Sequence, residues 1–208
     1  ATKQAVYRTT KEVFKELKKI LKEVAEELNN KMCNVDKNVQ IKFNDKGEFE
    51  AELSFSGDVL IFHFHSNTFH FDKSHHIWNS SYAKADEYRT YCGVINIYNF
   101  LSDSFKYNRE NDLGYLIGRM FINKEKHFFV EGKGKMSFLY NDFTNAVIDK
   151  EALKSILQEA IIFAMDFELL TPPFNDVQVV TLHQIKEMSQ NMKLKTAKRL
   201  GFRFSNEK

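Results

Sequence analysis

The stretch VQIKFNDKGEFEAELSFSGDVLIFHFH, residues Val39 to His65, decides the fold that this sequence predicts. Apolar and polar residues alternate through its first two segments, and the turn-forming runs Asn44–Gly47 and Ser56–Asp58 separate its three segments. Alternation with a period of two is typical of strands that bury one face, and short turn sequences join antiparallel neighbours. We therefore expect a three-stranded antiparallel meander over residues 39–65.

The third segment, Val59–His65, differs from the first two because both of its faces are largely apolar. The segment Leu113–Ile122 has the same character. A strand that is dry on both faces must be covered on both sides. The sheet is therefore predicted to carry a second layer, to curl around a cavity, or to pair with another subunit, which would make the protein a homodimer.

Helical periodicity occurs in two parts of the chain. Residues 1–33 are predicted to form an N-terminal amphipathic helix, with its clearest part from Lys11 to Met32 after a capping-box pair at Thr9 and Glu12. The side opposite its apolar stripe carries lysine and glutamate. A second helix, near residues 149–169, is apolar nearly all round in its second half, which predicts that it is buried.

The remaining segments complete one domain. Strands are predicted over 93–101, 126–131, 135–140 and 177–182, irregular loop over 73–92, and a short helix over 184–198. Residues 113–140 would form a second meander. The expected fold class is α+β, a single domain over 1–208. Its curved, mainly antiparallel sheet of about seven to nine strands is packed by the N-terminal helix and the helix near 149–169.

Charge is unevenly distributed along the chain. The 208 residues carry a formal net charge of +2, so the whole chain is no strong attractant for nucleic acid. The C-terminal tail, residues 186–208, holds seven basic and two acidic side chains. A basic tail on a slightly acidic body indicates an anionic partner. Nucleic-acid binding through this tail is one functional hypothesis, and a solvated chain end is the alternative.

Several features bear on the location of the protein. No apolar run approaches the roughly 18 to 20 residues that a membrane span requires. Residues 1–11 contain no apolar segment of the kind found in a secretory signal. The two cysteines, Cys33 and Cys92, match no zinc or disulfide spacing. These features predict a cytoplasmic protein in reducing surroundings, without a membrane span.

Five of the seven histidines fall within fourteen residues. His63 and His65 are two residues apart on a predicted strand, so their rings share one face. A third ligand would complete a site for a zinc-like divalent metal ion with a position open for water, as a metal-dependent hydrolase requires. The candidates for that ligand are His70, His75, His76 and Asp72. The alternative is a half-exposed strand face that carries histidines without a metal.

Twenty phenylalanines predict an aromatic-rich interior, which is either plain packing or the wall of an apolar pocket. No convincing catalytic motif is present; Gly132-Lys133-Gly134-Lys135, for example, lacks the spacing of a phosphate-binding loop. The sequence therefore favours a non-catalytic binding or interaction protein that binds another protein or an apolar small molecule on an aromatic sheet face or groove. The predicted ligand-binding residues are Phe62, Phe64, Tyr115, Phe121 and Phe128.

Several short runs are similar to known sequences. They are residues 91–107, which begin Tyr91-Cys92-Gly93, then Phe128-Phe129-Val130-Glu131-Gly132, Phe138–Phe143 and Leu170-Thr171-Pro172-Pro173. Together they resemble a family of uncharacterised bacterial proteins over residues 63–180. The resemblance implies a bacterial, cytoplasmic protein. It implies no activity, cofactor or catalytic residue.

Overall fold

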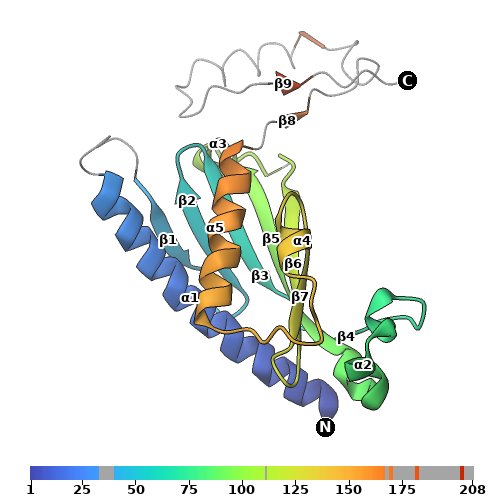
Figure 1. Cartoon of the computed structure of the whole chain (residues 1–208). Coiled ribbons are helices and arrows are strands. Elements are labelled where there is room, and N and C mark those ends of the chain that lie inside the picture. The colour runs from blue at the N-terminus through green and yellow to red at the C-terminus, as the bar shows by residue number, and fades with distance from the viewer. Residues whose placement is uncertain (33–39, 111, 167–168, 171–180, 183–201, 204–208) are drawn as a thin grey trace.

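The computed structural model describes residues 1–32, 40–110, 112–166, 169–170, 181–182 and 202–203. Within them, seven strands form one open antiparallel sheet with long helices on one face (Figure 1). The predicted α+β fold is therefore confirmed. The strands of this sheet are β1 (Lys42–Asp45), β2 (Glu50–Phe55), β3 (Asp58–Phe64), β4 (Phe69–His70), β5 (Tyr91–Leu101), β6 (Tyr115–Asn123) and β7 (Phe128–Gly132).

The strands follow the order β1-β2-β3-β5-β6-β7, and β4 pairs with the beginning of β5. β1 to β3 form the predicted meander, in which Phe43 lies opposite Leu53 and Leu53 lies opposite Leu60. The first hairpin turns at Gly47, whose φ of +96° is a left-handed conformation that glycine adopts without strain. Each of these strand pairs is antiparallel, and residues directly opposite each other point to the same face of the sheet.

The first helix, α1 (Thr2–Met32), lies diagonally across the sheet (Figure 1). It begins at Thr2, before the capping-box pair Thr9 and Glu12, so Thr9 does not cap it. Thr9 is instead an internal residue of the helix, and its hydroxyl donates to the carbonyl of Lys124 at 3.4 Å. The apolar stripe is buried as predicted, and each buried side chain contributes about 1.5–3 kcal/mol. Its main members are Val13, Phe14, Leu17, Ile20, Leu21 and Val24.

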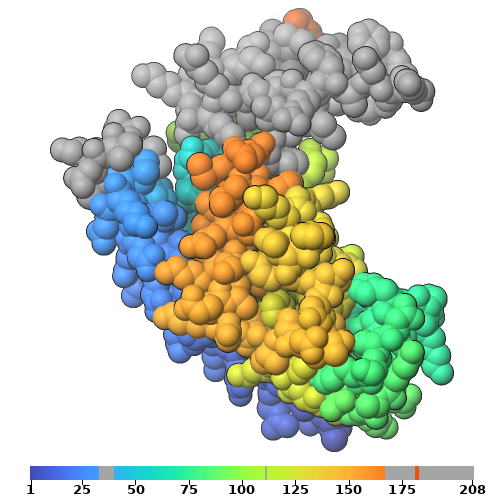
Figure 2. Space-filling view, in the orientation of Figure 1, coloured from blue at the N-terminus to red at the C-terminus, as the bar shows by residue number. Residues whose placement is uncertain are grey.

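The second long helix, α5 (Lys150–Asp166), lies beside α1 on the same face of the sheet (Figures 1 and 2). Ion pairs join the two helices. Nζ of Lys150 lies 2.9 Å from Glu23, and Nζ of Lys154 lies 3.2 Å from Glu27. One face of α5 is buried, and it consists of Leu153, Ile156, Leu157, Ala160, Ile161 and Ala164. The prediction that the second half of this helix is buried nearly all round is wrong, because Ile162 and Met165 are 53% and 60% exposed.

The predicted strand over residues 135–140 is wrong, because Met136–Leu139 is a short helix, α4. The Met136 side chain is buried beside Gly132, where a β-carbon on the glycine would lie 2.9 Å from that of Met136. The chain then returns along the outer edge of β7, and the Val130 amide donates to the Tyr140 carbonyl at 2.8 Å. A non-strand segment therefore occupies this edge of the sheet.

The face of the sheet opposite α1 carries a partial second layer. The short elements η1 (His76–Asn79), α2 (Ser81–Ala85) and η2 (Glu87–Thr90) fall in the predicted irregular region. They cover one end of β5, β6 and β7 over a second apolar cluster, Ile77, Cys92, Val94, Phe121, Phe129 and Phe143. At this end of the sheet, the strands that are apolar on both faces are covered on the second face by other segments of the same chain. Pairing with another subunit stays a prediction.

The remaining elements are short. α3 (Ser102–Lys106) follows β5, and β8 (Leu169–Leu170) pairs in parallel with β9 (Phe202–Arg203). The strand and helix predicted over 177–182 and 184–198 lie almost entirely outside the described residues. Among the helices that the structure describes, none combines the length and the apolar character that crossing a membrane requires.

Phe62 and Phe138 provide a matched test of this core. Phe62 is fully buried, whereas Phe138 on α4 is 85% exposed. We expect Phe62→Ala to lower the free energy of unfolding by about 3–5 kcal/mol, because it leaves a cavity in a packed interior. Phe138→Ala should change it by about 0.5 kcal/mol or less. Urea denaturation followed by circular dichroism measures both values, and equal losses would contradict the placement of Phe62.

Candidate functional site

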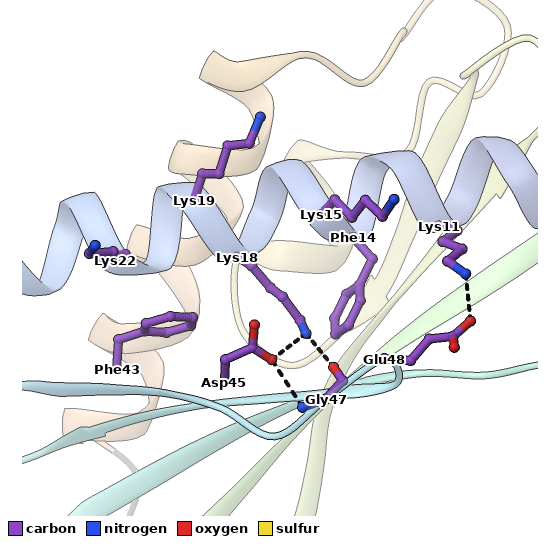
Figure 3. A pocket seen from close by; sticks show the side chains of 10 residues that line it. All are labelled: Lys11, Phe14, Lys15, Lys18, Lys19, Lys22, Phe43, Asp45, Gly47 and Glu48. Carbon is purple, nitrogen blue, oxygen red and sulfur yellow. Dashed lines mark hydrogen bonds and ion pairs between the residues drawn. The ribbon is translucent and has the colours of Figure 1, made fainter.

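A groove with a volume of about 840 Å³ runs between α1 and the β1–β2 hairpin (Figure 3). Five lysines of α1 line one side of it, and the hairpin lines the other. We call it the lysine groove, and its residues are Lys11, Phe14, Lys15, Lys18, Lys19, Lys22, Phe43, Asp45, Gly47 and Glu48.

The lysines stand along one edge of α1 because of their spacing. Lys11, Lys15, Lys18 and Lys22 are separated by four, three and four residues, which places them in a row on one side of a helix. The buried apolar stripe lies next to this row. Phe14, a member of that stripe, is 1% exposed and points from the helix toward the hairpin (Figure 3). The burial of α1 therefore places this row on the edge of the helix next to the hairpin, and the Lys11 and Lys18 side chains reach the hairpin (Figure 3).

Carboxylates of the hairpin hold two of the lysines. Nζ of Lys11 lies 2.6 Å from Oε1 of Glu48. Nζ of Lys18 lies 2.5 Å from Oδ1 of Asp45 and also donates to the carbonyl of Gly47. The Lys18 ammonium is the main cause that holds the pKa of Asp45 below its usual range. Lys11 acts in the same way on the pKa of Glu48. The inner side of the groove is therefore closed by ion pairs.

Of the other three lysines in the lining, two have no carboxylate partner among the described residues. Lys15 and Lys22 are exposed and form no ion pair with any described residue. Lys19 lies 3.0 Å from Glu16 on its own helix. Two lysines of the lining, Lys15 and Lys22, thus form no ion pair with a described residue. Such a surface attracts anions.

The five aromatic residues predicted to bind a ligand do not line this groove. Phe62, Phe64, Phe128 and, at its margin, Tyr115 belong to the main core, whereas Phe121 belongs to the cluster on the opposite face of the sheet. The structure therefore divides them between two layers. Phe64 packs behind the groove, with its ring centroid 5.8 Å from that of Phe14. A role of the five residues in ligand binding stays a prediction.

The predicted metal ligands form three separate groups. The rings of His63 and His65 are 6.4 Å apart between centroids. His75 and His76 lie 4.3 Å apart, and His70 packs on aromatic rings of β5 and η1. Among the described residues, no three histidine, cysteine, aspartate or glutamate side chains come together as a metal site. Binding of a zinc-like ion by His63 and His65 stays a prediction.

Comparison of the chain with known protein families, curated proteins and solved structures found no match. The resemblance to a bacterial family is therefore neither supported nor contradicted. The basic tail, residues 186–208, lies almost entirely outside the described residues, so nucleic-acid binding through it also stays a prediction. The lysine groove is the candidate site on the basis of its geometry.

The sequence pattern did not single out the lysine groove, although it contained one usable signal. The helical periodicity places lysine and glutamate on the polar side of α1 without separating the two charges. The two charges are in fact separated, since the lysine row faces the hairpin while Glu23 and Glu27 face α5. Plotting charge sign on a helical projection would have shown a basic row beside the buried stripe.

Lys18→Met tests the ion pair that closes the groove. Without the ammonium, the pKa of Asp45 should rise toward the usual value of about 3.9. A carboxyl whose pKa is lowered in the folded state stabilises the fold above its unfolded pKa, and this contribution is lost as pH falls through the folded pKa. The variant should therefore be less stable than the parent protein at neutral pH. This difference in stability should become smaller in acid. Carbon-13 NMR of the Asp45 carboxyl measures the titration directly.

Lys19→Met is the control for this measurement, because Lys19 pairs with Glu16 and not with the hairpin. In Lys19→Met, the pKa of Asp45 should be the same as in the parent protein. An Asp45 titration that does not move in Lys18→Met would show that the ion pair does not form in solution.

Proposed function

We propose that this protein is a non-catalytic binding protein whose lysine groove holds an anionic partner. One observation carries the proposal. Lys15 and Lys22 stand at the groove without an ion pair among the described residues, next to Lys11 and Lys18, which are paired. An anion that reaches the two unpaired ammonium groups gains charge-assisted contacts and leaves the ion pairs of the hairpin intact.

Repulsion between like charges on α1 supports binding of an anion. The pairs Lys11 and Lys15, Lys15 and Lys19, and Lys18 and Lys22 are each four residues apart. Like-charged pairs at this spacing destabilise a helix by about 0.2–0.5 kcal/mol each. The hairpin carboxylates form ion pairs with only two members of the row, Lys11 and Lys18. A bound anion relieves the remaining repulsion, so binding should also stabilise the protein.

The shape of the groove favours an extended ligand over a small one. Lys15 and Lys22 are seven residues apart, which corresponds to roughly 10 Å along a helix. Phe14 and the half-buried Phe43 lie between the helix and the hairpin and give the groove an apolar part (Figure 3). A small inorganic anion reaches one lysine at a time. A ligand with several acidic groups along its length reaches both.

This proposal keeps the class of function that the sequence favours and places it on a different surface. The metal-dependent hydrolase at His63 and His65 remains an alternative hypothesis that rests on residue type and spacing. Nucleic-acid binding through residues 186–208 rests on charge composition alone. The lysine groove adds defined contacts to the composition, and for that reason we place the function there.

Reversing the two unpaired lysines tests the proposal. Lys15→Glu combined with Lys22→Glu should weaken binding of a fluorescein-labelled deca-glutamate peptide by at least about tenfold, which corresponds to about 1.4 kcal/mol. Fluorescence anisotropy at low salt measures the affinity. Binding by the parent protein should weaken as salt is added, because exposed charges are screened beyond about 10 Å at 0.1 M ionic strength.

Lys133→Glu combined with Lys135→Glu is the matched control. It changes the net charge by the same amount, and both lysines are exposed in the turn that follows β7, at the opposite edge of the sheet from β1. This variant should bind the peptide like the parent protein. Equal weakening in both double variants, or a parent protein that does not bind, would contradict the proposal.

A further inference from the structure

The strand β1 is an edge of the sheet, and two of its residues, Phe43 and Asp45, line the lysine groove. The Lys46 amide donates to the Glu50 carbonyl at 3.2 Å. Hydrogen-bonded pairs alternate along an antiparallel ladder, so the backbone of Asn44 also faces β2. The N–H and C=O groups of Phe43 and Asp45 therefore face away from β2. No described residue forms a hydrogen bond with them.

Asn29 of α1 shows what this edge can accept. Its side-chain amide pairs with the backbone of Ile41, the outward-facing residue that precedes Phe43. Nδ2 of Asn29 donates to the Ile41 carbonyl at 2.7 Å, and the Ile41 amide donates to Oδ1 of Asn29 at 2.9 Å. These are the two bonds that a neighbouring strand would make. The amide thus caps one outward residue of the edge, and the next two, Phe43 and Asp45, have no such partner among the described residues.

The opposite edge of the sheet is closed by the chain itself. The outward amides of Phe128 and Val130 on β7 donate to the carbonyls of Ala146 and Tyr140, at 3.2 and 2.8 Å. Proteins commonly cover their strand edges, because an open edge pairs with other chains. The contrast between the two edges marks β1 as the one at which a further strand can pair.

We propose that a partner protein adds an extended acidic segment to β1 as a further strand. This inference rests on the proposed function and specifies its partner. The main chain of the segment would pair with Phe43 and Asp45, and its acidic side chains would reach Lys15 and Lys22. Side chains on one face of a strand repeat every roughly 7 Å, so every second residue of the segment faces α1. Backbone pairing supplies affinity, and the alternate side chains supply specificity.

A second copy of this chain is a poor occupant of the same edge. Pairing of β1 with β1 would bring together two lysine grooves, each with two lysines that form no ion pair with a described residue. Like charges that meet across an interface oppose association. Charged residues at a strand edge discourage self-pairing in this way. The lysines therefore disfavour self-association and select an acidic partner.

Nucleic acid also fits the groove less well than a peptide does. Phe14 is almost fully buried, so it presents no open ring on which a base could stack. Phe43 and Asp45 each turn one backbone N–H donor and one C=O acceptor away from β2. A peptide strand offers the complementary donors and acceptors at the same spacing.

Phe43→Pro and Phe43→Ala separate backbone pairing from charge. Both substitutions remove the ring, but only proline removes the outward N–H, which the pairing of β1 with β2 does not use. The probe is a fluorescein-labelled ten-residue peptide of alternating glutamate and valine. We expect Phe43→Pro to bind it at least about tenfold more weakly than Phe43→Ala does. Urea denaturation of both variants shows whether each is folded.

Amide hydrogen exchange gives a second measurement that needs no variant. At saturating peptide, exchange of the Phe43 and Asp45 amides should slow by at least about tenfold, because a hydrogen-bonded amide exchanges only after local opening. Exchange at Val130, on the closed edge, should not change. A version of the peptide that is N-methylated throughout should neither bind tightly nor slow exchange, because it cannot donate.

The outcomes separate this inference from the proposed function. If Lys15→Glu with Lys22→Glu abolishes binding, but Phe43→Pro binds like Phe43→Ala and exchange is unchanged, strand addition is wrong and the groove remains an anion site. If the charge-reversed variant binds like the parent protein, the proposed function is wrong too. If a ten-nucleotide oligouridine binds more tightly than the peptide and is indifferent to Phe43→Pro, the partner is a nucleic acid and strand addition is overturned.

Discussion

The burial of one stripe of α1 against the sheet is the interaction on which the rest of the structure depends. Phe14, Leu17 and Leu21 have almost no exposed surface. Each such side chain contributes about 1.5–3 kcal/mol, whereas each exposed ion pair along the edges of the helix contributes about 0–1 kcal/mol. Apolar burial therefore determines where α1 lies. The charges determine only which neighbour each edge of the helix faces.

Separation of charge across α1 supports this single orientation. Glu23 and Glu27 meet lysines of α5 on one edge, and the lysine row meets carboxylates of the hairpin on the other. Rotation of the helix about its axis would expose the stripe and would also bring like charges together on both sides. Agreement between packing and charge favours one arrangement over its competitors. A consequence is that a basic row stands at the edge strand β1.

The parts of the fold that one periodicity controls could be predicted from the sequence, as the meander over residues 39–65 and the buried face of α5 show. Residues 135–140 could not, because their helix depends on Met136 filling the space beside Gly132, a tertiary contact that overrides local preference. The alternation of apolar and polar residues along a strand also predicts which side chains share a face of the sheet. It does not predict what covers that face. The lysine groove could not be predicted, because Lys18 and Asp45, which form one of its ion pairs, are 27 residues apart in the sequence.

Two kinds of unsatisfied group coincide at β1. In a protein optimised for stability alone, Lys15 and Lys22 would be matched by carboxylates, as Lys11 and Lys18 are, or replaced by neutral helix formers. The backbone follows the same division, since Asn29 caps one outward residue of the edge and the next two are left without a described partner. The lysines and the backbone groups that lack a described partner have different causes, the first side-chain composition and the second strand order. Their presence side by side indicates a binding surface more strongly than either feature would alone.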